Sequence, residues 1–165
     1  MTSIVTTVRI LAERSLGESC GQQCVDWAIG MLATVESDDY VARLSSMQQP
    51  YNHFQIADLR DRAIDELGLL TGDISTNLTN YAAEILHAAI LGKMPLLDAL
   101  GAVKELCVAN DYQSDLYDFY LLYFAKVDLQ VDDYQYYWPD ANRDSIDRIA
   151  QEQIQDFLTT MKSAA

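Results

Sequence analysis

The most constraining feature of this sequence is the spacing of its apolar residues, which recur three and four positions apart through nearly the whole chain. That period gathers them on one face of an α-helix, whereas a half-buried strand would need strict alternation. Only 3 prolines and 7 glycines interrupt the 165 residues, which favours long elements. The sequence therefore predicts an all-α fold of about seven to eight helices, in which consecutive helix pairs could stack as in an α-solenoid.

Local start and stop signals bound the predicted helices. Gly17, Gly68 and Gly92 each follow an apolar run, where a residue that tolerates a left-handed conformation ends a helix. Asn52, three residues before Gln55, is typical of a capping box at a helix N-terminus. The predicted helices cover residues 4–16, 18–35, a short stretch including 40–44 after the cap Ser37, 52–67, 73–91, 95–107, 114–124 and 142–162.

The length of the chain predicts one compact helical domain, residues 1–165, because a chain of this size buries roughly 70% of its extended surface. Residues Met1–Arg14 lack the basic and then apolar pattern of a signal peptide. The longest apolar run, Ile85–Leu91, is too short to cross a bilayer. Three cysteines are an odd number, which argues against a disulfide framework. We therefore expect a soluble cytoplasmic protein that does not bind membranes.

The charge balance narrows the choice of partner. The chain has 25 acidic and 11 basic residues, which gives a net charge of −14. Such a surface repels the phosphates of nucleic acids, so direct binding of DNA or RNA is not expected. It attracts a basic protein or a cation and speeds association with it. The alternative interpretation is that the acidity serves solubility alone.

Few residues have the spacing of a chemical site. Glu84 and His87 form one Glu-x-x-His pair on a predicted helix, but a di-metal bundle site needs two such pairs. Cys20 and Cys24 lie one helical turn apart, yet a structural zinc site needs four ligands, and buried free cysteines are common core residues. No nucleophile elbow, phosphate-binding loop or His-Glu-x-x-His motif occurs. We therefore predict no catalytic residues, no metal and no cofactor.

The most informative stretch is residues 105–140, which we call the acid–aromatic segment. It contains eight acids and one base, so it holds −7 of the net charge of −14. Seven of the ten tyrosines lie there; Tyr120 and Tyr123, with Phe119, are expected in the core. Aromatic residues dominate binding hot spots, and carboxylates pair with Arg and Lys of a partner. The predicted partner-binding residues are Asp128, Asp132, Asp133, Tyr134, Tyr136, Tyr137, Trp138 and Asp140.

Two other readings of this segment stay open. Valine, tyrosine and tryptophan favour strands, so Asp128 to Trp138 could form one short extended piece. Alternatively, Tyr136, Tyr137 and Trp138 could fold back and fasten the last helix to the body, which would leave the aspartates in solvent.

In overall character the chain resembles bacterial immunity proteins of contact-dependent inhibition and related polymorphic-toxin systems. The resemblance is carried by the residues 118–124, Asp-Phe-Tyr-Leu-Leu-Tyr-Phe, and 132–138, Asp-Asp-Tyr-Gln-Tyr-Tyr-Trp. It implies a non-enzymatic protein that binds one cognate toxin and blocks its active site. Toxins of this kind are often basic nucleases, so an acidic face would imitate the phosphates of their substrate.

Other functions remain possible on the sequence alone. One alternative is a helical adaptor or an inhibitor that mimics DNA charge, which the net charge of −14 would also suit. Another is a metal-dependent helical enzyme, for which Glu84 and His87 would be the first residues to test.

Overall fold

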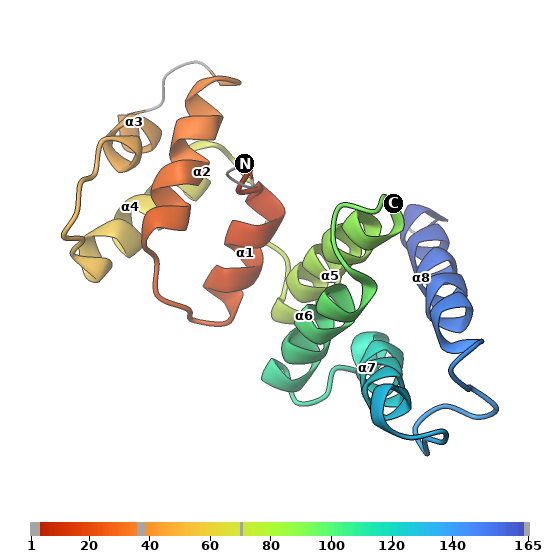
Figure 1. Ribbon diagram of the computed structural model, residues 1–165. Coiled ribbons are helices and arrows are strands. Elements are labelled where there is room, and N and C mark those ends of the chain that lie inside the picture. The colour runs from red at the N-terminus through yellow and green to blue at the C-terminus, as the bar shows by residue number, and fades with distance from the viewer. Residues whose placement is uncertain (1–3, 36–38, 70, 164–165) are drawn as a thin grey trace. The chain divides into compact units, whose positions relative to one another are not determined.

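The computed structural model describes residues 4–35, 39–69 and 71–163, and every regular element in these ranges is helical (Figure 1). They contain eight α-helices and one short 3₁₀ helix, which confirms the predicted all-α class and the predicted number of helices. The alternative of a short extended piece between Asp128 and Trp138 is not found, because no residue of that stretch lies in a strand. Among the described helices, none is both long enough and apolar enough to cross a membrane.

Contacts between Cα atoms divide the chain into two compact units, Met1–Asn77 and Leu78–Ala165. In both units, most pairs of helices that follow one another in the sequence pack together, as the amphipathic pattern suggests. The single domain expected from the chain length stays a prediction.

The first unit is built around a buried tryptophan. Its helices are α1 (Thr7–Ser15), α2 (Gln22–Leu32), α3 (Asp39–Ser45) and α4 (His53–Glu66). Trp27 is 1% exposed, and its indole Nε1 donates a hydrogen bond to Thr7 Oγ1 at 3.0 Å. Around it pack apolar side chains from all four helices, including Ile10, Leu44 and Ile64. The one polar atom of the indole is therefore satisfied while the ring is buried.

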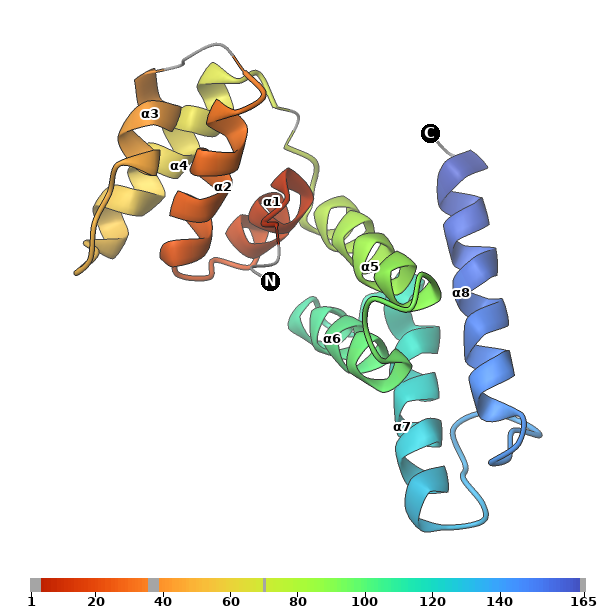
Figure 2. The same cartoon turned by 45° about the horizontal axis from the view of Figure 1, so that its top comes forward.

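The second unit consists of the rest of the chain and carries the acid–aromatic segment. Its helices are α5 (Ile74–Ile90, which begins just before the boundary), α6 (Leu96–Ala109), the 3₁₀ helix η1 (Ser114–Leu116), α7 (Tyr117–Val131) and α8 (Ile146–Ser163). Helix α7 packs against both α6 and α8. Figure 2 shows α7 and α8 side by side, joined at one end by the long connection between them. Leu122 and Ile154 are fully buried, one from each of these two helices.

The predicted helix ends that depend on local chemistry are confirmed. Gly17, Gly68 and Gly92 have φ angles of 68°, 63° and 69°, a left-handed conformation that glycine adopts without steric cost. The side chain of Asn52 accepts a hydrogen bond from the backbone N–H of Gln55 at 3.1 Å and so caps α4. The predicted cap Ser37 lies outside the described residues.

Other boundaries are displaced from their predicted positions. Helix α1 begins at Thr7, because the side chain of Thr6 caps it by accepting from the N–H of Arg9. Ser114 starts η1 instead of capping α7 directly. Helix α8 begins at Ile146, because the side chain of Asn142 accepts from the N–H groups of Asp144 and Ser145 in a preceding turn.

Replacing Asn52 by alanine should destabilise the first unit by about 1 kcal/mol, because the orphan N–H at the start of α4 loses its acceptor. Urea unfolding followed by circular dichroism would measure the loss. Asn80→Ala is the matched control, since Asn80 is exposed within α5 and alanine is the better helix former. Equal unfolding midpoints for Asn52→Ala and the unaltered chain would contradict this assignment.

Replacing Glu18 by glutamine should stabilise the protein at neutral pH. Glu18 is exposed overall, but desolvation of its carboxyl group, with a smaller repulsion from Glu13, raises its pKa, so its charged form is disfavoured in the folded state. The penalty is present above the folded pKa, and it disappears as pH falls below the unfolded value of about 4.3. The urea midpoint of Glu18→Gln should therefore exceed that of the unaltered chain at pH 7 and match it near pH 3. A constant difference across this range would contradict the electrostatic cause.

Candidate functional site

Five aromatic side chains form a continuous row along α7 and the segments on either side of it. We call Tyr112, Tyr117, Tyr120, Phe124 and Tyr137 the aromatic row. The rings of Tyr117 and Tyr120 are stacked, with centroids 5.4 Å apart and planes 11° from parallel. The ring of Tyr112 meets that of Tyr120 edge to face at 5.5 Å. Phe124 continues the row, with its centroid 5.0 Å from Tyr120 and 5.4 Å from Tyr137.

The row exists because α7 has two apolar faces. Phe119, Leu122, Ala125 and Leu129 are buried in the core of the second unit. Tyr117, Tyr120 and Phe124 follow the i, i+3, i+7 spacing of a different face. Tyr112 and Tyr117 are 54% and 40% exposed, whereas Tyr120 and Phe124 are half-buried. The rings thus cover one another and still leave aromatic surface open to a partner.

The position of Tyr112 depends on a strained turn between α6 and η1. Asp111 and Tyr112 have φ angles of 50° and 57°, and each non-glycine residue in this region costs about 1–3 kcal/mol. The buried side chain of Gln113 offsets the cost: its Nε2 donates to Thr79 Oγ1 at 2.7 Å, and its Oε1 accepts from Asn110 at 2.9 Å. The backbone N–H of Gln113 also donates to the carbonyl of Cys107 at 3.1 Å.

The end of the acid–aromatic segment forms an irregular loop of residues 132–140, which we call the acidic loop. The side chain of Gln135 organises it. Its Oε1 accepts from the N–H groups of Tyr137 and Trp138, both at 2.7 Å. Its Nε2 donates to the carbonyls of Trp138 and Ala141. These bonds satisfy backbone groups that a strand would have paired with a neighbour, which explains why no strand forms here.

The predicted partner-binding residues fall into two groups. Tyr134 and Tyr136 are 62% and 88% exposed, and Asp132, Asp133 and Asp140 are also exposed. Asp128 and Trp138 are half-buried, and Tyr137 lies against Phe124. The ring contact of Tyr137 is with Phe124 of α7, and Tyr137 is still 39% exposed. The folded-back reading, in which these residues fasten the last helix, stays a prediction for Tyr137 and Trp138, while Tyr136 lies open to solvent. The assignment of all eight residues to a partner-binding site stays a prediction.

Basic side chains near the segment are engaged with acids or aromatic rings. Lys104 lies 4.9 Å from the ring centroid of Tyr123, and its hydrogen bond to Glu105 raises the pKa of the ammonium group. Lys126 pairs with Asp147 of α8. Arg143 pairs with Asp133 at 2.9 Å, and its Nε donates to the carbonyl of Leu129 at the end of α7. Arg143 thereby ties the acidic loop to α7.

Sequence reasoning missed part of this surface. Tyr120 and Tyr123 were expected in the core, but both are half-buried; only Phe119 is fully buried there. Tyr112 and Tyr117 were not expected at the site at all. The i, i+3 spacing of Tyr117 and Tyr120 was the signal in the sequence that these two rings share one face of the helix. Desolvation of the Tyr120 hydroxyl raises the pKa of its phenol, and the neighbouring tyrosines add a smaller contribution.

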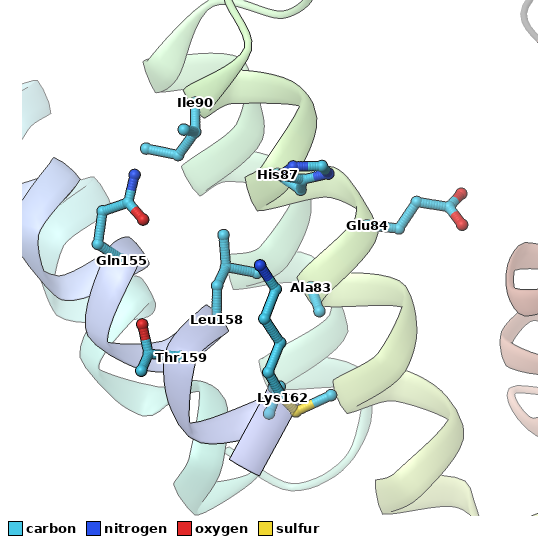
Figure 3. A pocket seen from close by; sticks show the side chains of 9 residues that line it. Ala83, Glu84, His87, Ile90, Gln155, Leu158, Thr159 and Lys162 are labelled. Carbon is cyan, nitrogen blue, oxygen red and sulfur yellow. The ribbon is translucent and has the colours of Figure 1, made fainter. Parts of the chain in front are cut away.

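Glu84 and His87 lie beside a groove of about 540 Å³ between α5 and α8. Figure 3 shows Lys162 reaching from α8 toward α5, whereas Glu84 projects away from the groove. The two residues of the Glu-x-x-His pair therefore do not converge on one point. Within the described parts of the chain, no three His, Cys, Asp or Glu side chains are grouped as a metal site would require.

The cysteines differ from their expected state. Cys20 and Cys24 form a disulfide bond, so the expectation of free thiols at these positions is wrong. Cys20 lies just before α2 and Cys24 in its first turn, and their Cα atoms are 5.9 Å apart, within the usual range for a disulfide. Cys107 is free and buried, and burial raises the pKa of its thiol. Because disulfides persist in oxidising compartments, the bond bears on localisation, and the cytoplasmic location stays a prediction.

Comparison with known proteins yields no relative. No family model matches the chain, and no curated protein or solved structure matches it significantly. Any function must therefore be argued from the residues themselves.

Replacing Gln135 by alanine should release the acidic loop without unfolding the helices. The N–H groups of Tyr137 and Trp138 would lose their acceptor, and each lost hydrogen bond is worth about 1 kcal/mol. Hydrogen exchange at these two amides should accelerate about fivefold. Gln151→Ala on the exposed side of α8 is the control. Unchanged exchange in the Gln135 variant would show that its side chain does not hold the loop.

Proposed function

We propose that this protein is a non-enzymatic binding protein that neutralises a basic, nuclease-type toxin by covering its active site. The observation that carries the proposal is the aromatic row, which runs along α7 into the acidic loop. Together they form one surface within the second unit, with partly exposed rings and exposed carboxylates.

The composition of this surface suits a protein partner. Protein interfaces are enriched in aromatic residues at their centre, and a few such residues carry most of the binding energy. Tyr117 and Tyr120 are already stacked, so little side-chain freedom is lost when a partner covers them. The exposed Tyr134 and Tyr136, whose ring centroids lie 5.9 Å apart, add contact area at the loop.

The charge of the surface selects a basic partner. The acid–aromatic segment has a net charge of −7, and its acids include the exposed Asp132, Asp133 and Asp140. A nuclease binds a polyanion and so presents a positive active site. Carboxylates that approach such a site occupy the positions of substrate phosphates, and their attraction speeds the encounter.

Affinity capture from the native host identifies the partner. The chain is used as bait in lysate treated to remove nucleic acids. The proposal is supported when a basic nuclease is recovered and its activity on DNA or RNA is blocked by an equimolar amount of the purified chain. Recovery of a DNA-bound complex, with no nuclease inhibited, favours the alternative of DNA mimicry.

Replacing Asp132 and Asp133 together by lysine should weaken inhibition of that nuclease on the order of 100-fold, because like charges would then face each other across the interface. The helices should persist, since the ion pair between Asp133 and Arg143 is exposed and contributes little to stability. Circular dichroism checks the fold, and titration of nuclease activity gives the inhibition constant.

The matched control changes the same amount of charge elsewhere. Asp65 and Asp156 are exposed on α4 and α8, outside the acid–aromatic segment. Their joint replacement by lysine should leave inhibition within a few fold, because only the long-range attraction is reduced. Equal losses in the two double variants would indicate that net charge acts without a specific surface.

A further inference from the structure

One end of the aromatic row borders a surface hollow. It has a volume of about 600 Å³ and is lined by Tyr112, Ser114, Tyr117, Asp118 and Tyr120. Three of its five lining residues are tyrosines, and its walls are fixed by the ring contacts of Tyr120 with Tyr117 and with Tyr112. The ring planes of Tyr112 and Tyr120 lie 83° apart, so the two tyrosines form a corner.

The stretch of chain that supplies the lining of the hollow is acidic, and Asp118 is the charged residue among the lining residues. Residues 105–118 include four acids and no base. Within the described parts of the chain, neither Asp115 nor Asp118 pairs with a basic side chain. The nearest base in sequence, Lys104, is bound to Glu105 and lies over the rings of Tyr123 and Phe124. A carboxylate beside electron-rich ring faces attracts a cation of the partner.

The rings and acceptors that line the hollow distinguish between the two cationic side chains. A guanidinium group is flat, stacks on aromatic faces and donates several N–H bonds in one plane. Tyr112 and Tyr117 are both exposed, so ring surface is open for such stacking. The carboxylate of Asp118 and the hydroxyl of Ser114 also line the hollow and can accept hydrogen bonds. An ammonium group is a compact point charge that holds its water more strongly, so it gains less from the rings.

We propose that the hollow lined by Tyr112, Tyr117, Tyr120 and Asp118 is a binding site for an arginine side chain of a basic protein. The guanidinium group lies against a tyrosine ring and donates to the carboxylate of Asp118. The site deepens the proposed function, because the basic toxin would supply the arginine. It is nevertheless a property of this chain alone and is tested without any toxin.

The test uses three short peptides with blocked ends that differ only in the central residue: arginine, lysine or citrulline. Citrulline has nearly the shape of arginine but no charge. Each peptide is titrated into the full chain at low salt, and the NMR signals of the tyrosine rings and backbone amides are followed. The arginine peptide should shift the signals of Tyr112, Tyr117 and Tyr120, with a Kd on the order of 1 mM for a single bound side chain.

Variants locate the site. Asp118→Asn keeps the shape of the side chain and removes its charge, and Tyr117→Leu keeps apolar packing and removes the ring face. Each should raise the Kd of the arginine peptide about fivefold. The controls are Asp156→Asn on α8 and Phe54→Leu on α4, which remove an exposed charge and an exposed ring elsewhere. Both should leave the Kd unchanged.

Three results would overturn the proposal. They are shifts of equal size with citrulline, equal affinity for lysine and arginine, and no saturable shift at the three tyrosines. Failure here is distinct from failure of the toxin proposal. If the arginine peptide binds and no nuclease is inhibited, the arginine site stands and the toxin function falls. If a nuclease is inhibited and the peptide does not bind, the toxin function stands and the arginine site falls.

Discussion

The buried amide of Gln113 determines where the acid–aromatic surface can form. A polar side chain that is 7% exposed must satisfy its hydrogen bonds inside the protein, and this one does so with Thr79 on α5 and Asn110 at the end of α6. Those bonds place the turn that reverses the chain between α6 and α7. This turn holds Asp111 and Tyr112 in a left-handed conformation that neither residue favours. In this conformation the ring of Tyr112 meets that of Tyr120 edge to face.

Helix α7 then has more apolar surface than its neighbours cover. Its buried face, which includes Phe119 and Leu122, packs against the core of the second unit. Its aromatic face is covered only in part, by rings that pack on one another and by Tyr137 returning from the acidic loop. A helix that is apolar nearly all round is usually buried. The additional apolar surface of α7 consists of aromatic rings that pack on one another. Because the rings cover part of each other, they can remain at the surface beside carboxylates without leaving a large apolar patch exposed.

Much of the fold could be predicted because its signals are local. Gly17, Gly68 and Gly92 end helices since only the residue itself decides whether a left-handed conformation is tolerated. Asn52 caps α4 because its side chain reaches the backbone N–H of Gln55, only three residues away. The alternative of a strand in this stretch is not realised because the side chain of Gln135 binds the backbone groups of Tyr137 and Trp138. Strand propensity does not include hydrogen bonds from a side chain that competes with strand pairing for the backbone groups.

The site was harder to predict because exposure is not a local property. Composition located the acid–aromatic segment, but the spacing of Tyr117, Tyr120 and Phe124 has two interpretations, a core face or a surface row. Only the packing of α6 and α8 on α7 decides between them. The disulfide of Cys20 and Cys24 was missed for a related reason, since an odd number of cysteines says nothing about which two are close.

Acids and rings on this surface have different physical effects on binding. Exposed carboxylates such as Asp132 act through solvent, where charges are screened beyond about 8 Å at physiological salt, so they raise the rate of encounter more than the lifetime of a complex. Rings such as Tyr117 act by losing water on contact, which lengthens the lifetime and depends little on salt. An acidic chain without such rings would meet basic proteins quickly and release them quickly. In the proposed complex, the net charge of −14 would speed the encounter, and the aromatic row would be the part of the surface that prolongs binding.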